Sequence, residues 1–399
     1  MPSYPAGTPD RIPHWVRLLD HVLALTIACP LVSLLWCGGF FLTDTYIYPN
    51  DKPFGYWLIF IVGSMLSLNV HIHCDSLIAI SARCPDSAQL LQRLIGIVLI
   101  VTIVFQWDGL WCLLDYYLGH TQISCFYCWA LGTVVLCLTG CRNNMVTGVP
   151  FMCRHDRAEL LFAATTRFHA KFRSRLQSYG SRLWSFCDQL FSIFVVQPSV
   201  ILIWRGLWNI QDYTLLPKDP VKSANISCLA GTLVTIVLYL LQDSVAEITL
   251  ALRPCARFGV ELVWQQLAVA SSVTLWRGQW VWFALIFEEL ASMWFVTLAA
   301  GWILTILNMG GLSTQLGAVP DPPLDIRTDV IRFPIDYVAQ IYKTHVQYTA
   351  LIKQQQQPGQ RLSTSPLSKP LLKTNRATAK ALYPLLDEIQ LPLPDSLPS

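Results

Sequence analysis

Residues 21–42 read HVLALTIACPLVSLLWCGGFFL, and no Asp, Glu, Lys or Arg interrupts them. A helix needs roughly 20 apolar residues to cross the bilayer core, which is about 30 Å thick. Backbone groups in lipid must hydrogen-bond within the protein, so only helices and closed barrels can span it. Barrel strands alternate over about 10 residues. This stretch is apolar throughout, and it therefore predicts a membrane-spanning helix.

The rest of the chain repeats this pattern between short polar breaks. Of all residues 53% are hydrophobic and only 13% are charged, against roughly 25% charged in a soluble domain. A soluble protein would expose much of that apolar surface to water. We expect an all-α, polytopic transmembrane helical bundle of about eight spans. The predicted spans are 21–42, 56–80, 90–113, 122–140, 187–210, 224–242, 262–284 and 286–308.

Positive charge is unevenly distributed among the connections. The loop after the fourth span and the segment after the eighth are rich in Arg and Lys, while the loop after the third span has neither. By the positive-inside rule, we expect residues 1–20, the loop 141–186 and the tail 309–399 to be cytosolic. Lys218 and Lys222, after the fifth span, fit this orientation least well.

The two halves of the chain share residues at a constant offset of 168 positions. Matches in Asp, Pro, Trp and Gly are not expected between unrelated apolar segments. The matched pairs include Asp20/Asp188, Pro30/Pro198, Trp36/Trp204, Gly38/Gly206, Asp44/Asp212 and Asp75/Asp243. We therefore predict two four-span repeats, 21–140 and 187–308. An even number of spans returns the chain to its starting side, so the repeats would be parallel, with their axis along the membrane normal.

A Trp-x-Gly motif recurs near the predicted outer end of each odd-numbered span. Its residues, with the aromatic residue that follows two positions later, are Trp36, Gly38, Phe40, Trp107, Gly109, Trp111, Trp204, Arg205, Gly206, Trp208, Trp276, Arg277, Gly278 and Trp280. One interpretation is an interfacial aromatic belt, in which glycine allows close helix packing. The other is a pseudo-symmetric outer vestibule, whose two arginines face an anionic ligand or a partner. Arginine at an interface can snorkel, so its presence does not require a ligand.

Asp75 and Asp243 occupy matched positions near the cytosolic ends of the second and sixth spans. Carboxylates inside a membrane are associated with transport and proton relay. Asp75 lies within about two turns of the end of its span, where its charge can reach the interface. A structural role at the helix end and a functional pair of intramembrane acids both stay open.

The cytosolic loop contains a basic amphipathic segment. Between 160 and 186, large apolar residues recur at steps of three and four, as on one face of a helix. The basic residues on the remaining faces are Arg167, Lys171, Arg173, Arg175 and Arg182. Such a helix can lie on anionic lipid or bind a calmodulin-like partner, or it can be only a short surface helix. We expect the tail to be largely disordered apart from a helix-capable piece near 334–353.

The sequence carries no motif for catalysis or for a cofactor. It has no Walker loop, no Gly-x-Gly-x-x-Gly after a strand and no Gly-x-Ser-x-Gly. We therefore expect no enzyme activity, no cofactor and no nucleic-acid partner. His71 and His73 are metal ligands by type, but they lie about 200° apart around a helix. We expect no metal site from them.

Two further features lie near the predicted outer face. Cys112, Cys125 and Cys128 either form a disulfide or are packing cysteines. Asn225-Ile-Ser227 is a glycosylation sequon, although it lies close to the sixth span. The pairing of the cysteines and the glycosylation of Asn225 both stay open at this point.

The predicted spans, the Trp-Arg-Gly-x-Trp segments at 204–208 and 276–280, and Trp-x-x-x-Asp at 208–212 together resemble the fuseless family of invertebrate eight-pass membrane proteins. The resemblance covers about 15–310. It implies a presynaptic plasma-membrane protein that helps to place voltage-gated calcium channels and so supports synaptic transmission. It brings no catalytic residues. The first half departs from the motif, because Cys37 and Asp108 stand where the second half has arginine.

Two functions are consistent with these features. The first is a non-enzymatic organiser in the lipid bilayer, which binds a voltage-gated calcium channel or presynaptic scaffold proteins through its cytosolic loop and tail. The second is a secondary solute transporter with a path between two pseudo-symmetric halves. Pro30 and Pro198, as matched mid-span breaks, favour the transporter, and the scarcity of mid-span charge counts against it.

Overall fold

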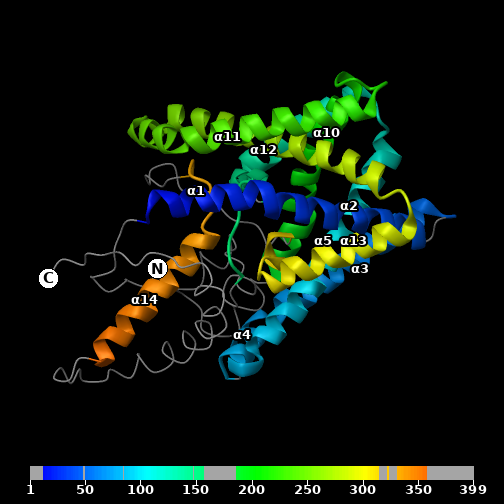
Figure 1. Cartoon of the computed structure of the whole chain (residues 1–399). Coiled ribbons are helices and arrows are strands. Elements are labelled where there is room, and N and C mark those ends of the chain that lie inside the picture. The colour runs from blue at the N-terminus through cyan, green and yellow to red at the C-terminus, as the bar shows by residue number, and fades with distance from the viewer. Residues whose placement is uncertain are drawn as a thin grey trace.

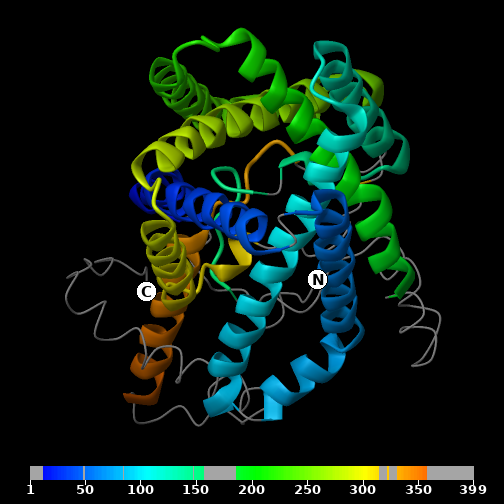
Figure 2. The ribbon, with the colours of Figure 1, turned by 90° about the vertical axis from the view of Figure 1, so that its right-hand side faces the viewer.

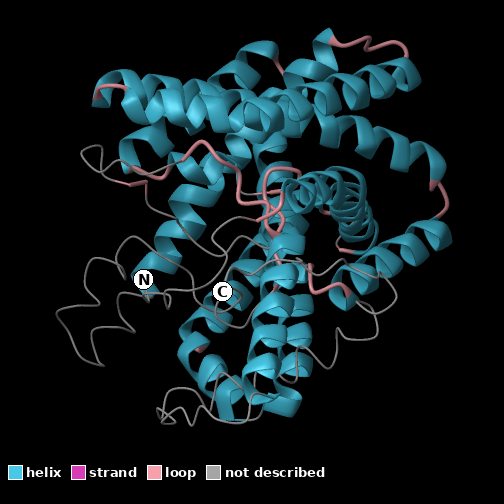
Figure 3. Cartoon of the chain, turned by 60° about the vertical axis from the view of Figure 1, so that its left-hand side comes forward, coloured by secondary structure: helices cyan, strands magenta, loops and turns pink. Residues whose placement is uncertain are grey.

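The fold is known from a computed structural model that describes residues 12–47, 50–83, 85–146, 148–156, 186–313, 321–322 and 330–356. Among these residues the regular structure is helical, and the one β contact is an isolated bridge between Cys153 and Ile335 (Figure 3). The expected all-α fold is confirmed.

The helices vary widely in length (Figure 1). The α-helices are α1 (His14–Leu23), α2 (Cys29–Tyr46), α3 (Lys52–Ile72), α4 (Cys74–Arg83), α5 (Pro85–Leu118), α6 (Gln122–Thr139), α10 (Gln197–Thr214), α11 (Pro220–Ala251), α12 (Pro254–Ile286), α13 (Leu290–Ile306) and α14 (Tyr337–Gln356). Two π turns, η1 (Ala24–Ala28) and η3 (Ser192–Val196), and two 3-10 helices, η2 (Arg142–Val146) and η4 (Gly310–Ser313), complete the set that the structure describes.

Six helical stretches are long and apolar enough to cross a membrane: His14–Tyr46, Lys52–Ile72, Ala88–Leu118, Gln122–Thr139, Phe186–Thr214 and Pro220–Ala251. They correspond to the first six predicted spans, although the second ends at Ile72, where a turn at His73 leads into α4. α12 is as long but carries Gln265 and Gln266 near its centre, and α13 is apolar but only 17 residues long. The chain is a multi-pass membrane protein, and the count of eight spans stays a prediction.

A π turn precedes a proline in two of these stretches. η1 ends two residues before Pro30, and η3 ends two residues before Pro198. Proline lacks an amide proton, and in a regular α-helix its ring collides with the carbonyl four residues earlier. A π turn changes the helix locally at that carbonyl. Both helices therefore continue through their prolines, and the expected mid-span breaks are wrong.

Four inner helices form a ring around a common axis. α2 contacts α5 and α12, and α10 contacts the same two helices, so the contacts close in a circle. Each inner helix carries one outer helix: α3 lies on α5, α6 on α10, α11 on α12, and α13 on α2. Three of these pairs join predicted spans that follow one another in the chain, namely the second with the third, the fourth with the fifth and the sixth with the seventh. The fourth joins the first and the last of the eight predicted spans.

The outward faces of the outer helices are apolar. Leu138 of α6, Leu240 of α11 and Phe295 of α13 are 81%, 74% and 72% exposed. In water, such side chains would form a large unfavourable patch, whereas lipid accommodates them. Their exposure agrees with a position in a bilayer.

Residues 148–153, which follow α6, fold into the ring of helices instead of running over its surface (Figure 2). We call residues 148–153 the axial loop. Its residues Val149 and Phe151 are fully buried. The Trp276 indole donates a hydrogen bond to the Val149 carbonyl at 2.9 Å, and the Tyr239 hydroxyl donates to the Pro150 carbonyl at 2.6 Å. The axial loop therefore fills the ring from the end where α6 finishes.

Part of the tail returns to the bundle as α14. The amides of Val338 and Ala339, at its first turn, donate hydrogen bonds to the Asp20 carboxylate of α1 at 2.5 and 3.1 Å. The rest of the tail beyond 356 lies outside the described residues, as does the whole basic segment with Arg167, Lys171, Arg173, Arg175 and Arg182. The basic helix, the disorder and the duplication all stay predictions.

Candidate functional site

Four tryptophans, one from each inner helix, meet on the axis of the ring. Trp36, Trp107, Trp204 and Trp276 are each more than nine-tenths buried. Going round the circle from Trp36, neighbouring ring centroids lie 5.1, 5.8, 5.3 and 6.0 Å apart, and every pair meets edge to face. This geometry is favourable because the positive edge of one ring meets the negative face of the next. We call this closed circle the tryptophan ring.

A second aromatic layer lies about one turn further along the inner helices. Trp208 contacts Trp111 at 5.9 Å and Trp280 at 5.6 Å, and Trp280 contacts Phe40 at 5.2 Å. These are the aromatic residues that follow the Trp-x-Gly motifs. The two layers together fill this part of the axis with aromatic side chains.

The glycine of each motif lies where an inner helix touches its outer helix. A methyl group on Gly206 would come within 2.6 Å of the Cys125 carbonyl oxygen of α6. The other glycines that meet their outer helix this closely are Gly38 on α13, Gly109 on α3 and Gly278 on α11. Each motif therefore fixes two contacts, because its tryptophan faces the axis and its glycine receives the outer helix.

Arg205 lies fully buried beside the tryptophan ring. Its guanidinium donates to the Asp115 carboxylate at 2.6 Å, to the Gly119 carbonyl at 2.6 Å and to the Cys128 sulfur at 3.1 Å. Asp115 belongs to α5, the neighbouring inner helix. The ion pair therefore joins two members of the inner ring.

Arg277 makes the equivalent contacts one helix further round the ring. Its guanidinium donates to the Asp212 carboxylate of α10 at 2.7 Å, and to the Ser223 and Ser227 hydroxyls of α11 at 3.0 and 2.9 Å. Both arginines stand one residue after a motif tryptophan, and both carboxylates stand eight residues after one. The two pairs thus repeat one arrangement.

This packing tests the first interpretation of Trp-x-Gly, which joined an interfacial aromatic belt with close helix packing at the glycine. The close packing at glycine is present. The four tryptophans do not form an interfacial belt, because they are buried against one another. Arg205 and Arg277 are 0% and 4% exposed, and each is bound to a carboxylate. An outer vestibule in which they bind an anion stays a prediction that this pairing does not support.

Asp243 lies at the surface and not inside the bundle. Its side chain is 57% exposed and accepts from Arg332 at 2.5 Å, with Arg17 at 3.9 Å. Through these contacts α11 is tied to α1 and to the segment before α14. Asp75 lies in α4, and its side chain is outside the described part of the structure. A functional pairing of the two acids stays a prediction.

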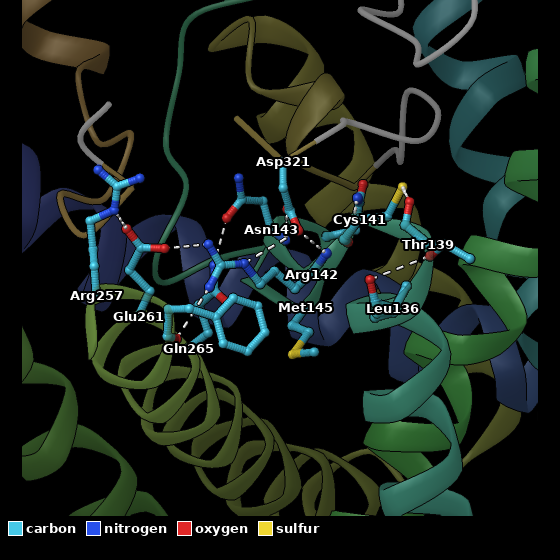
Figure 4. A network of polar contacts seen from close by, with 12 residues as sticks. Leu136, Thr139, Cys141, Arg142, Asn143, Met145, Arg257, Glu261, Gln265 and Asp321 are labelled. Atoms are coloured by element: carbon cyan, nitrogen blue, oxygen red, sulfur yellow. Dashed lines mark hydrogen bonds and ion pairs between the residues drawn. The ribbon is translucent and has the colours of Figure 1, made fainter. Parts of the chain in front are cut away.

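A buried ionic network holds the chain where it leaves α6 (Figure 4). Arg142, which is 1% exposed, binds the Glu261 carboxylate of α12 and lies 3.3 Å from Asp321. Its guanidinium also covers the Phe258 ring at 4.6 Å, and Arg257 lies 3.5 Å from the second oxygen of Glu261. The network fixes the start of the segment that becomes the axial loop.

Two carboxylates cap short helices that lie far from them in the chain: Asp321 caps η2, and Asp156 caps η4. Asp321 accepts from the amides of Arg142 and Asn143 in η2 at 3.1 and 2.9 Å, and Asp156 accepts from the Gly311 amide in η4 at 3.0 Å. Burial raises the pKa of Asp156 from the ordinary 3.8 to about 7. Burial also raises the pKa of Asp321. Each carboxylate therefore caps the start of a short helix that lies far away in the chain.

The features predicted near the outer face are used in packing. Cys112, Cys125 and Cys128 are free thiols in the structure. Asn225 lies on α11, where its side chain accepts a hydrogen bond from the Trp282 indole at 3.2 Å. Ser227 of the sequon is buried and binds Arg277. The sequon thus lies on a helix and not in the surface loop that is usual for an acceptor.

The sequence alone does not predict the partners of both arginines or the network around Arg142. One signal was present: an aspartate stands eight residues after the motif tryptophan in three inner helices, as Asp44, Asp115 and Asp212. Eight residues rise about 12 Å along a helix. Whether an arginine that follows a tryptophan reaches such a carboxylate on the neighbouring helix depends on helix tilt and packing, which the spacing alone does not give.

Comparison with known proteins gives one match. The family model described as Fuseless matches residues 15–312, which is most of the chain. No match to the chain was found among the curated proteins or among the solved structures.

Proposed function

The chain belongs to the fuseless family, and from this premise we propose that it is a non-enzymatic organiser of the presynaptic plasma membrane. In this role it helps to place voltage-gated calcium channels and so supports synaptic transmission. Its termini, the loop 141–186 and the tail face the cytosol, in line with the positive-inside rule. The channel or a presynaptic scaffold protein binds through that loop and tail.

The filled axis is the observation that favours an organiser. The tryptophan ring closes the bundle at one level, and the axial loop occupies it on the side of Val149 and Phe151. Transporters built from repeats place their binding site at mid-membrane between the halves, commonly at interrupted helices. Here the helices continue through Pro30 and Pro198.

The cytosolic side supplies a fixed base for docking segments. Arg142 and its partners anchor the chain directly after α6, and Asp20 anchors the start of α14. Anchored ends hold a connecting segment close to the membrane surface, where it can meet a channel in the same bilayer. This arrangement supports a role in positioning another membrane protein.

The proposal is tested by neutralising the basic segment in neurons. The variant replaces Arg167, Lys171, Arg173, Arg175 and Arg182 with Gln. We expect normal surface expression and a loss of calcium-channel clustering at release sites, measured by imaging and by evoked release. Replacing Lys218 and Lys222 with Gln, on the predicted outer side, is the control and should leave clustering unchanged. Normal clustering in the five-residue variant would contradict docking through this loop.

Transport is the second candidate, and it has its own test. The purified chain in liposomes is assayed for flux of a broad panel of solutes, alongside a variant with Asp75→Asn and Asp243→Asn. An organiser shows no flux above empty liposomes, and the variant keeps its synaptic localisation. Flux that the double substitution abolishes would establish the transporter instead.

A further inference from the structure

The inner ring offers four equivalent places for a charge pair. Each lies between the residue after one tryptophan and the residue eight positions after the tryptophan of the preceding inner helix. Two places hold the arginine–aspartate pairs of α5 with α10 and of α10 with α12. A third, between α12 and α2, holds neutral Ala284 and Cys37, whose sulfur lies 4.0 Å from the Trp280 carbonyl oxygen. The fourth, between α2 and α5, holds two acids, Asp44 and Asp108.

Asp108 has no positive partner among the described ion pairs. Its side chain is fully buried, and its hydrogen-bond donors are the Thr43 hydroxyl and, at 3.4 Å, the Cys112 thiol. Asp44 is exposed at the rim of the bundle. Lys52 acts on Asp44 through its charge, but the two form no ion pair in the described part of the chain. Both neighbours of the buried carboxylate are thus neutral donors.

The geometry of this place suits a bound cation. Ligand atoms of Asp44, Asp108 and Cys112 all lie within 4.8 Å of one another. A buried carboxylate that faces a second acid is costly unless a positive charge lies between them. In the two charged equivalents a guanidinium supplies that charge, at 2.6 and 2.7 Å from its carboxylate. Two of the four equivalent places thus hold a guanidinium, and the place between α2 and α5 holds two acids instead.

We propose that the place between α2 and α5 binds a divalent cation of the Zn²⁺ type through Asp44, Asp108 and Cys112. Two carboxylates and a thiol suit a borderline-soft ion, whereas Ca²⁺ and Mg²⁺ prefer shells made of oxygen alone. The cation enters past Asp44, from the end that we predict to lie outside the cell. Once bound, it joins two inner helices as Arg205 and Arg277 do elsewhere. This ligand set is separate from the histidines considered in the sequence.

The first experiment titrates the purified full-length protein in detergent, after removal of metal with EDTA, with Zn²⁺. Tryptophan fluorescence reports thermal unfolding, and we expect Zn²⁺ but not Ca²⁺ or Mg²⁺ to raise the Tm. Asp108→Asn should weaken Zn²⁺ binding by about tenfold or more. Cys255→Ser removes an exposed thiol of α12 and is the matched control with unchanged affinity. With Co²⁺ as the probe, the wild type should show a thiolate-to-metal absorption band that Cys112→Ser abolishes.

The second experiment restores the guanidinium. Asp108→Arg places a cation where α10 and α12 carry one, so we expect a metal-independent Tm at or above that of the Zn²⁺-loaded wild type. Two results would overturn the proposal. One is a wild type whose Tm and absorption spectrum do not respond to metal. The other is Zn²⁺ affinity that survives in every variant that folds among Asp108→Asn, Asp44→Asn and Cys112→Ser, so that one variant's failure to fold does not decide the test.

Discussion

Arg205 illustrates how this chain keeps a full charge in its interior. Taking one ion out of water costs several kcal/mol in real proteins. The Asp115 carboxylate, the Gly119 carbonyl and the Cys128 sulfur offset that cost by accepting from the guanidinium. The result is an ionic joint between α5 and α10, and Arg277 with Asp212 forms the equivalent joint between α10 and α12.

Removing only the arginine should therefore be severe. Arg205→Met removes the buried guanidinium and leaves Asp115 with only the exposed His120, 3.7 Å away, so we expect a loss of about 3–5 kcal/mol in the free energy of unfolding. Adding Asp115→Leu should recover part of that loss, because an apolar pair replaces an orphaned charge. Thermal unfolding in detergent measures both variants. If the double variant is no more stable than Arg205→Met, the ion pair is not what the single substitution disrupts.

Asp156 should make stability depend on pH. The pKa of its carboxyl is about 7 in the folded chain and 3.8 ordinarily, so between these values the folded state binds the extra proton. Stability from this group is therefore greatest at low pH and falls as pH rises from about 4 to about 7. Asp156→Asn cannot titrate but still accepts from the Gly311 amide. Its Tm should fall less than that of the wild type between about pH 5 and about pH 7.5, and an equal fall would contradict this assignment.

At the scale of helices, glycine sets how closely inner and outer helices approach. A Cβ on Gly109 would lie 2.7 Å from the Tyr56 carbonyl oxygen of α3, whereas a Cβ on Gly96 of the same helix would meet nothing within 4 Å. Gly109→Ala should separate α3 from α5 and lower the Tm. Gly96→Ala should be neutral or stabilising by about 0.5–1 kcal/mol, because alanine favours helix. Equal effects of the two substitutions on the Tm would show that the close approach is unimportant.

Helix identity follows directly from the sequence, but helix pairing does not. Apolar runs of the right length, such as 21–42 and 122–140, predict their helices because lipid leaves the backbone no alternative. The π turns before Pro30 and Pro198 depend on how each helix relieves one steric clash. The second predicted span, 56–80, runs past the turn at His73, although His71, His73 and Asp75 make this stretch more polar than the rest of the span.

The molecule as a whole is held together by segments that sequence reasoning treats as connections. Phe151, in the axial loop, packs against Phe333 at 4.4 Å and Tyr239 at 5.8 Å between ring centroids. Phe151→Ala should cost about 3–5 kcal/mol, as for a phenylalanine in a core. Thermal unfolding of this variant, compared with the exposed Phe126→Ala on α6, checks it. A loss no greater than that of the Phe126 variant would mean that the axial loop is peripheral.

The ring order was beyond prediction for a physical reason. Matched residues in the two halves indicate a common plan, and residues such as Trp36 and Trp204 do occupy equivalent places. The partner of α2, however, is α13, and neither apolar length nor periodicity ranks one outer helix above another. The same holds for Arg142, whose burial depends on residues far away in the chain.

The pairing of α2 with α13 bears on how this protein is made. A ribosome delivers α2 to the membrane as the first of the predicted spans, and its neighbour α13 as the last of them. Until then α2 is the one helix of this described ring that lacks its outer helix. A product truncated before α13 would leave the Gly38 face of α2 uncovered, because no other described helix takes that place.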